Sequence, residues 1–231
     1  MSLDIITICT DESAQGYRKL LKSAALCGFD IKNIWDGRPW PGLSAKPKLI
    51  KCYIETHACN DSTILFVDGL DTVFNRHPRN PIEVFRERQR GILFSTEKNC
   101  YPRKDWAHRF PPAPFGNKYL NSGCIIGSAT VMYDMLIGIN ADGIPGDYER
   151  SDGTWKTFID QEYFAGYYLD NPTTVGLDIN CDLCLSLYPS ASISFETEGV
   201  KNLELNKFPI LIHGNGPSKQ ALKQVWDWLN L

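Results

Sequence analysis

The chain has 231 residues and a formal net charge of -3, with acidic and basic side chains interspersed. This length suits one large α/β domain or two small ones, and the lack of a basic patch argues against a nucleic-acid-binding protein. No apolar run approaches the length of a membrane-spanning helix. The first ten residues lack the basic start and long apolar stretch of a signal peptide. We therefore expect a cytoplasmic protein if the chain is complete, and a secretory one if a leader was removed.

The chain contains eight cysteines, but their spacing forms no framework. Four of them lie in apolar contexts typical of small core residues, namely Cys9, Cys27, Cys52 and Cys124. Cys181 and Cys184 form an isolated C-x-x-C pair, and a zinc site would need a second pair at a suitable spacing. We expect no structural metal there, and the sequence leaves a disulfide open.

The first third of the chain alternates between strand and helix patterns. Apolar runs predict strands at residues 5–10, 31–35 and 63–67, the last introduced by the turn signal Asn60-Asp61-Ser62. Helical spacing predicts helices at 13–27 and 48–58, and the proline-rich segment 36–47 is expected to be a loop. Such a βαβαβ beginning predicts an α/β fold with a mostly parallel central sheet flanked by helices and right-handed crossovers.

The remainder predicts further α/β units. We expect helices at 81–90, 130–139, 162–169 and 220–229, and strands at 91–95, 120–127, 174–178 and 208–212. Residues 140–153 are expected to form a loop, and the stretch from 179 to 206 looks less regular. Residues 99–118 are rich in proline and aromatic side chains, and so long a loop is usually functional; we expect a wall or lid over the site. No repeat or linker is visible, which predicts one domain over residues 1–231.

The segment Asp68-Gly69-Leu70-Asp71 closes the third predicted strand. In open α/β sheets, ligands bind beyond the carboxyl ends of the strands. A carboxylate pair at that place suits a hard divalent cation that carries phosphate. The alternative is a hairpin, because Asp-Gly is the commonest two-residue turn.

A second motif, His213-Gly-Asn-Gly-Pro-Ser-Lys219, follows the last predicted strand. Gly214 and Gly216 let backbone N–H groups approach a ligand closely, and the helix start beyond them favours phosphate. Lys219 adds a charge for a pyrophosphate, and His213 would be the third metal ligand. Two carboxylates and an imidazole fit Mn²⁺ better than Ca²⁺. The alternative is a glycine-rich helix entry with a histidine that is hydrogen-bonded within the protein.

These motifs give the chain a specific resemblance. It looks like the N-terminal glycosyltransferase domain of the multifunctional procollagen lysyl hydroxylase family, over nearly the whole chain. The strongest stretches are residues 66–71, 94–97, 119–123 with 126–127, and 212–217. The resemblance implies a GT-A fold, a UDP-sugar donor and Mn²⁺. It also implies transfer of glucose to galactosylhydroxylysine of collagen, with retention of the donor's α configuration. A hydroxylase would require a second domain.

Carried over by position, the resemblance assigns roles to particular residues. The manganese ligands would be Asp68, Asp71 and His213. Thr10 would contact the uridine of the donor. Lys46 would also bind the donor, and so would Tyr101, which stands where the family has tryptophan. The diphosphate would be held by Gly214, Asn215, Gly216 and Lys219. The sugar would face Asn121, Asp160 and Gln161, an order shared with retaining transferases of the glycogenin type. Alternatives stay open at three positions: a solvated loop charge at Lys46, a plain loop aromatic at Tyr101, and a helix N-cap at Asp160.

The chain departs from the family at two places. Thr157-Phe158-Ile159 stands where the family has a run of aspartates, and Leu177-Asp178-Ile179 stands where it has Leu-Asp-His. Both departures concern the sugar and the acceptor, so a galactosyltransferase or another UDP-sugar transferase with a different acceptor is an alternative. A non-catalytic UDP-sugar-binding module is an alternative of another class. A metal phosphoesterase is disfavoured, because two-metal sites need further His and Asp ligands.

Overall fold

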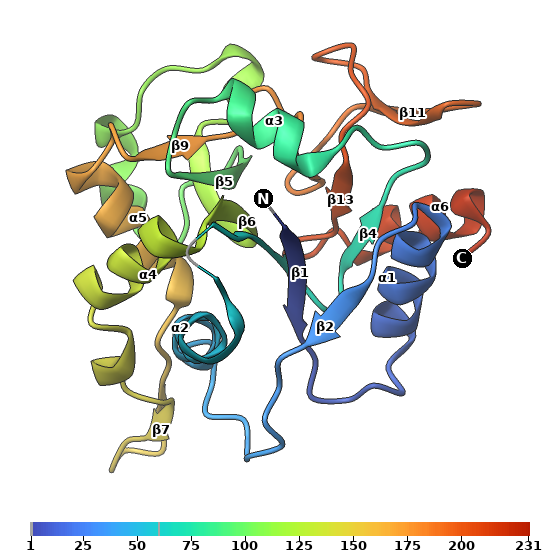
Figure 1. Cartoon of the computed structure of the whole chain (residues 1–231). Coiled ribbons are helices and arrows are strands. Elements are labelled where there is room, and N and C mark those ends of the chain that lie inside the picture. Colours follow the sequence, from blue (N-terminus) through green and yellow to red (C-terminus); the bar gives the residue numbers. More distant parts are fainter. Residues whose placement is uncertain (1, 60) are drawn as a thin grey trace.

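The computed structural model describes residues 2–59 and 61–231, so Met1 and Asn60, part of a predicted turn, lie outside the described residues. Within these ranges the main sheet has nine strands in the order β2-β1-β3-β6-β5-β10-β13-β4, with β9 paired to β5 (Figure 1). The strands are β1 (Leu3–Ile8), β2 (Ile31–Asn33), β3 (Thr63–Asp68), β4 (Thr72–Phe74), β5 (Ile92–Glu97), β6 (Tyr119–Ser128), β9 (Val175–Leu177), β10 (Cys184–Ser186) and β13 (Leu211–His213). Strands β6 and β4 run antiparallel to their neighbours and the other pairs are parallel. The predicted mostly parallel α/β sheet is confirmed.

Helices cover both faces of this sheet. They are α1 (Gln15–Leu26), α2 (Ala45–His57), α3 (Pro81–Glu87), α4 (Ala129–Gly138), α5 (Asp160–Asp170) and α6 (Lys219–Leu229). Figure 1 shows α2, α4 and α5 on one side of β1, with α1 beside α6 on the other. Because side chains of a strand alternate between faces, Ile64 and Phe66 join the core under α2, α4 and α5, whereas Leu65 and Val67 join the core under α1 and α3. Within the described residues, no helix combines the length and apolar character needed to cross a bilayer.

Three predicted loops contain regular structure. Helix α2 begins at Ala45 rather than at residue 48, and Pro47 lies in its first turn, where a missing N–H costs little because that group has no helical partner. The predicted loop 140–153 contains β7 (Tyr148–Glu149), which pairs with β8 (Trp155–Lys156) just beyond the loop. Residues 99–118 include the short 3₁₀ segments Lys104–Arg109 and Pro114–Gly116.

The stretch predicted to be less regular, residues 179–206, contributes a strand to the middle of the sheet. Strand β10 lies between β5 and β13, and β11 (Ile193–Glu196) forms a hairpin with β12 (Gly199–Asn202). The expectation was wrong because a three-residue strand is too short to show a period. The buried carboxylate of Asp178 accepts backbone N–H groups of Leu183 (2.7 Å) and Cys184 (3.1 Å) and so fixes the entry to β10. Burial raises the pKa of Asp178 to about 6.

The hairpin alternative at residues 68–71 is wrong. Strand β3 pairs with β1 and β6, whereas β4, just after the turn, pairs with β13. The turn therefore carries the chain from one part of the sheet to another and leaves both carboxylates at the carboxyl end of β3.

The cysteines lie partly where the sequence predicted. Cys9 and Cys124 are buried, Cys27 is half-buried, and Cys52 is exposed on the outer face of α2, which corrects its assignment to the core. All eight thiols are free, and the two cysteines of the C-x-x-C pair, Cys181 and Cys184, are buried. Burial raises the pKa of both of these thiols well above the ordinary value.

Two glycines allow the 68–71 turn to sit tightly against the first βα unit. A Cβ at Gly69 would lie 2.6 Å from the carbonyl oxygen of Ile8, and one at Gly16 would overlap the carbonyl oxygen of Leu70. The first turn of α1 therefore supports the backbone of the turn that carries Asp68 and Asp71 directly.

We expect Gly16→Ala to lower the free energy of unfolding by about 1–3 kcal/mol, the usual cost of overpacking, because backbone must move to admit the methyl group. Gly166→Ala is the matched control: it is also a helical glycine, but its Cβ would meet Trp106 at an ordinary 3.4 Å. Urea denaturation followed by circular dichroism measures both. Equal midpoints for the two variants would contradict the close approach of α1 to the turn.

Candidate metal and nucleotide-sugar site

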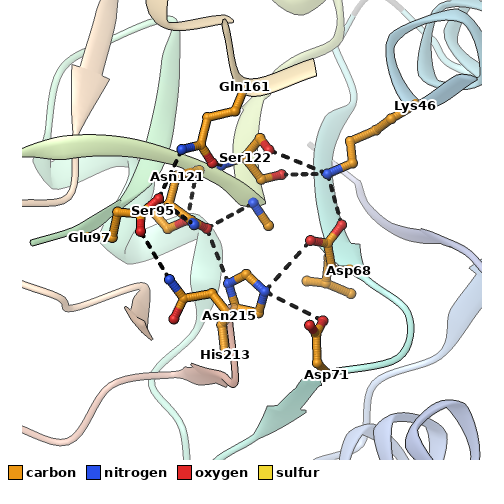
Figure 2. A network of polar contacts seen from close by, with 12 residues as sticks. Lys46, Asp68, Asp71, Ser95, Glu97, Asn121, Ser122, Gln161, His213 and Asn215 are labelled. Atoms are coloured by element: carbon orange, nitrogen blue, oxygen red, sulfur yellow. Dashed lines mark hydrogen bonds and ion pairs between the residues drawn. The ribbon is translucent and has the colours of Figure 1, made fainter. Parts of the chain in front are cut away.

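A cavity of about 390 Å³ opens at the carboxyl ends of β3 and β13. Ten of the predicted site residues line it, contributed by six different parts of the chain: Lys46, Asp68, Asp71, Tyr101, Asn121, Asp160, Gln161, His213, Asn215 and Gly216. Figure 2 shows most of these side chains converging on one polar network. The structure therefore brings these ten predicted residues to one cavity, although they come from segments far apart in the chain.

Asp68, Asp71 and His213 form a group that can hold a metal ion. One ligand atom from each lies within 4.8 Å of the others. His213 Nε2 is 3.6 Å from Asp68 Oδ2 and 3.4 Å from Asp71 Oδ1 (Figure 2). Two carboxylate oxygens and one imidazole nitrogen facing the same point suit a divalent cation of the manganese type.

The charges of this group shift one another. Burial alone would lower the pKa of His213, but the carboxylates of Asp71 and Asp68 raise it to about 9. Burial raises the pKa of Asp68. Burial acts in the same direction on Asp71, but the imidazolium of His213 outweighs it and holds the pKa of Asp71 below its ordinary value. In the metal-free protein, a proton on His213 thus occupies the place that a cation takes when it binds.

Lys46 joins the metal group to the predicted catalytic residues. Its Nζ atom lies 2.9 Å from Asp68 Oδ1 and 2.8 Å from Asp160 Oδ2, and it donates to the carbonyl oxygen of Ser122 at 3.2 Å. The side chain comes from α2 and is buried, so the alternative of a solvated loop charge is wrong. Burial opposes the charged form, but Asp160 and Asp68 outweigh it and raise the pKa of Lys46.

Asp160 is the first residue of α5, not its cap. The N-cap is Ile159, which makes no side-chain capping bond, and the N-cap alternative for Asp160 is therefore wrong. The carboxylate is buried and aligned by Lys46. This leaves Asp160 as an oriented negative group in the wall of the cavity.

Glu97, at the end of β5, is a site residue that the predictions missed. Its buried carboxylate accepts amide hydrogens of Asn121 (3.1 Å), Gln161 (2.9 Å) and Asn215 (3.1 Å). Burial raises its pKa, although these hydrogen bonds act in the opposite direction. A buried carboxylate facing three amides sets the orientation of all three, because only their NH₂ ends can point at it.

Gln161 and Asn121 are fully engaged within this network. Besides Glu97, the Gln161 amide donates to the carbonyl oxygen of Tyr101 (2.8 Å), and its oxygen accepts from the backbone N–H of Ser122 (3.0 Å). Asn121 Oδ1 lies 3.1 Å from His213 Nδ1 (Figure 2). Since Glu97 takes the NH₂ end of Asn121, His213 Nδ1 donates to its oxygen. When a metal displaces the Nε2 proton, the lone pair of Nε2 then faces the same point as the carboxylates of Asp68 and Asp71.

The space for the imidazole ring depends on Gly123. A Cβ at this position would overlap the His213 ring. The Asn121-Ser122-Gly123 stretch therefore positions the histidine in two ways. The amide oxygen of Asn121 accepts a hydrogen bond from one ring nitrogen, and Gly123 leaves room for the ring because it has no Cβ.

Some residues of the glycine-rich segment after β13 bond within the protein, and others face the cavity. The N–H of Gly214 donates to the carbonyl oxygen of Asp71 at 2.7 Å, so it is engaged in tying the two metal-binding segments together. Asn215 is held by Glu97 and by the backbone N–H of Tyr188 (2.9 Å). Gly216, with φ +56°, lines the cavity. Lys219, the first residue of α6, is exposed, and its charge helps to lower the pKa of Asp71.

The side chains of two predicted donor-binding residues, Thr10 and Tyr101, make no contact within the polar network. Thr10 is exposed just beyond β1 and is not among the residues that line the cavity. Tyr101 does line it, with 49% of its side chain exposed, and its carbonyl oxygen is held by Gln161. Farther along, Phe110 is buried against Tyr168 at a centroid distance of 5.6 Å. Part of the 99–118 segment is thus a packed wall, and closure of its beginning over a donor stays a prediction.

Comparison with known proteins identifies the class. A solved glycosyltransferase involved in glycosylation of the major capsid of PBCV-1 superposes with a TM-score of 0.59 over 97% of this chain and 99% of its own, at 12% identity. At this level of identity the likeness shows the fold alone, which is the GT-A fold.

The family follows from the sequence. A family model described as "PLOD GT domain" matches residues 1–230, and the chain belongs to this family. It is 28% identical to procollagen-lysine,2-oxoglutarate 5-dioxygenase 1 of Bos taurus over 99% of the chain. It is 27% identical to the multifunctional procollagen lysine hydroxylase and glycosyltransferase of Caenorhabditis elegans over 98% of the chain. The chain spans about a third, 32%, of the length of each of these relatives.

We expect Mn²⁺ to bind more tightly as pH rises, by roughly tenfold per pH unit below about 9, because the metal must displace the proton on His213. Calorimetric titration of the metal-free protein between pH 6 and 8, in buffers of different ionisation enthalpy, measures both affinity and proton release. Asp71→Asn should weaken binding by more than the roughly ten- to hundredfold that loss of an outer-shell partner costs. The exposed carboxylate of Asp134 supplies the control, Asp134→Asn. An affinity that does not change with pH would contradict this protonation state.

Replacement of Glu97 tests the role of the amide network. Glu97→Gln places an NH₂ group where three amide donors converge, so Asn121 loses its alignment and His213 its orientation. We expect the affinity for Mn²⁺ to fall about tenfold, as for other second-shell changes, while the thermal midpoint changes little. The exposed Glu83 gives the control, Glu83→Gln. Wild-type metal affinity in Glu97→Gln would show that the carboxylate does not act through His213.

Proposed function

We propose that the chain is a Mn²⁺-dependent retaining glycosyltransferase that moves glucose from UDP-glucose to galactosylhydroxylysine on a collagen-like acceptor. Membership of the PLOD GT family supports transferase chemistry, and the printed names of the relatives, which refer to procollagen lysine, support the acceptor class. The observation that carries the proposal is the Asp68, Asp71 and His213 group at the carboxyl ends of β3 and β13. A bound Mn²⁺ would neutralise charge on the diphosphate leaving group.

The chain's own residues position the donor. Asp68, Asp71 and His213 would hold the metal, and Gly216 lets the backbone approach the diphosphate. The exposed Lys219 at the start of α6 adds positive charge beside it. Because α6 begins there, its N-terminal dipole also favours a phosphate group.

Asp160 is the better placed of the two predicted catalytic residues at the start of α5. Its carboxylate lines the cavity and pairs with Lys46, so it suits the positive charge that develops at the anomeric carbon as the diphosphate leaves. Gln161 has both amide hydrogens engaged by Glu97 and Tyr101, which fits a positioning role. The acceptor hydroxyl attacks from the face the leaving group vacates and gives its proton to the departing phosphate oxygen.

A non-catalytic UDP-sugar-binding module is the second candidate. The observation that favours it is that the groups expected to face the sugar already have partners within the protein. Lys46 pairs with Asp160, and Gln161 makes three hydrogen bonds. A binder needs the metal group and the glycine-rich segment but no group acting on the transition state. The donor sugar separates further alternatives, since a galactosyltransferase would use UDP-galactose with free hydroxylysine.

Release of UDP distinguishes an enzyme from a binder. We expect the wild-type chain, with Mn²⁺ and UDP-glucose, to hydrolyse the donor slowly and to transfer faster when galactosylhydroxylysine is added. Asp160→Ala should lower kcat at least about a hundredfold, with little change in donor affinity, because it acts on charge present only in the transition state. EDTA and Asp68→Ala should abolish UDP release, and the exposed-site change Asp134→Ala should not.

The full measurement crosses UDP-glucose and UDP-galactose with peptides that carry free or galactosylated hydroxylysine. If the wild type binds UDP-glucose but releases no more UDP than Asp68→Ala with any of these acceptors, the transferase proposal is wrong and the binding module replaces it. Faster turnover with UDP-galactose would instead change the donor.

A further inference from the structure

Three side chains on the wall of the metal-site cavity keep polar atoms free for a ligand. They are Asn99, Tyr101 and Tyr188. Among the residues that the structure describes, the Asn99 amide and both phenol hydroxyls have no hydrogen-bond partner. Tyr101 is a predicted donor-binding residue, whereas Asn99 and Tyr188 have no part in the metal group or in the predicted donor site. These two half-buried side chains are therefore available to the second substrate.

The loops that carry Asn99 and Tyr188 begin next to each other. Strands β5 and β10 are parallel neighbours in the sheet, with Thr96 beside Leu185. Asn99 and Tyr188 each follow this pair by three residues, and both side chains line the same cavity. Because parallel neighbours end at the same edge of the sheet, the amide and the phenol lie on one part of the cavity wall.

The amide network around Glu97 fixes the position of Tyr188. The backbone N–H of Tyr188 donates to Asn215 Oδ1 at 2.9 Å. The Asn215 amide in turn donates to the buried carboxylate of Glu97 at 3.1 Å (Figure 2). The Tyr188 ring lies beside Gly216, where a Cβ would be 3.6 Å from it. The phenol is thus held before any ligand arrives, which is what a selective site requires.

The proposed retaining reaction fixes where the acceptor lies. Its hydroxyl attacks the face of the sugar that the diphosphate leaves and passes its proton to the departing oxygen. Acceptor and diphosphate are therefore neighbours at the moment of transfer. Gly216 is the residue proposed to lie against the diphosphate, and the Tyr188 ring lies beside Gly216. This arrangement puts the Tyr188 hydroxyl on the acceptor's side of the reacting carbon.

The charges of the cavity favour a sugar hydroxyl over the hydroxyl of hydroxylysine. The carbon that carries the hydroxylysine hydroxyl is bonded to the carbon that carries the ammonium group, so a site for it needs a free carboxylate nearby. Here Asp68 and Asp71 belong to the metal group, Asp160 pairs with Lys46, and Glu97 accepts three amides. The free groups are neutral, and an amide and a phenol match the uncharged hydroxyls of a sugar.

We propose that Tyr188 and Asn99 form an acceptor-sugar subsite. They bind hydroxyl groups of the galactose unit that receives the glucose, and Tyr188 keeps the attacking hydroxyl beside the diphosphate. The inference rests on the proposed transferase function and adds to it two residues that select a glycosylated acceptor. Tyr188 contributes hydrogen bonds only: the new bond joins the anomeric carbon to the acceptor oxygen, the bond to the diphosphate oxygen breaks, and that oxygen takes the acceptor's proton.

Two substitutions remove the proposed hydrogen bonds and keep the shape of the wall. Tyr188→Phe deletes one hydroxyl and leaves the ring beside Gly216, and Asn99→Leu replaces the amide by an apolar group of similar size. Neither removes a side-chain hydrogen bond of the described structure, so the thermal midpoint should stay at the wild-type value. Tyr148→Phe is the matched control, because Tyr148 is exposed on β7 and does not line the cavity.

We expect each cavity variant to raise KM for galactosylhydroxylysine about three- to tenfold, the effect of one neutral hydrogen bond. KM for UDP-glucose should keep its wild-type value in both variants, and Tyr148→Phe should change neither constant. Calorimetric titration of galactosylhydroxylysine into the protein with Mn²⁺ and UDP measures acceptor affinity without turnover. Free hydroxylysine, titrated in the same way, should bind more weakly and should not distinguish the variants from wild type.

The results separate the subsite from the reaction. If wild type transfers glucose and both cavity variants keep its KM and affinity for galactosylhydroxylysine, the subsite is refuted and the transferase stands. A parallel rise of KM for UDP-glucose would also refute it, because the two groups would then bind the donor; so would an equal loss with free hydroxylysine. If wild type transfers nothing but binds galactosylhydroxylysine through Tyr188 and Asn99, the transferase proposal fails and the subsite survives. Neither binding nor transfer would refute both.

Discussion

One buried ammonium group connects the parts of the molecule that the site needs. Lys46 lies between the carboxylates of Asp68 and Asp160, and a charge in this environment costs several kcal/mol unless it is paired. The helix that carries Lys46, the end of β3 and the start of α5 are thereby held in one arrangement. Loss of either carboxylate would remove one of the two contacts that hold the ammonium group and so change the position of the other pair. The metal-binding turn and the sugar-facing residue are therefore energetically coupled, although they lie far apart in the chain.

Glu97 has the complementary role on the opposite wall of the cavity. Lys46 pairs with two carboxylates, whereas Glu97 accepts hydrogen bonds from the side-chain amides of Asn121, Gln161 and Asn215. These come from a central strand, a helix start and a glycine-rich loop, so the negative charge fixes three separate segments. Its effect passes through Asn121 to His213 and so to the metal group. Groups oriented before a ligand arrives cost no reorganisation during the reaction, which is how a polar site stabilises developing charge.

The sequence predicted the elements with strong patterns and missed those whose form depends on distant contacts. The apolar run ending at Asp68 and the glycine-rich run beginning at His213 were visible because each follows a strand of ordinary composition. Strand β10 was not, because its three residues are too few to show a period, and its entry is fixed by the buried carboxylate of Asp178. Lys46 and Pro47 were expected in a loop because proline signals a break, yet the first helical turn tolerates it. Glu97 lies just beyond the predicted strand 91–95, and the resemblance over 94–97 assigned it no role. Its importance arises only where three amides from elsewhere converge.

Helix α5 shows where a departure from simple patterning carries information. A surface helix normally buries its apolar side chains and exposes its polar ones. Here Asp160 and Gln161 are buried, while Tyr163 and Tyr167 remain half-exposed. Burying these polar groups is tolerable only because Lys46, Glu97 and backbone groups pair with them, and leaving aromatic rings half-exposed forgoes part of their burial energy. Both departures lie on α5, whose first residues line the cavity beside the metal group. Departures from simple patterning are expected at functional positions, so the sequence of this helix is set by the site as well as by the core.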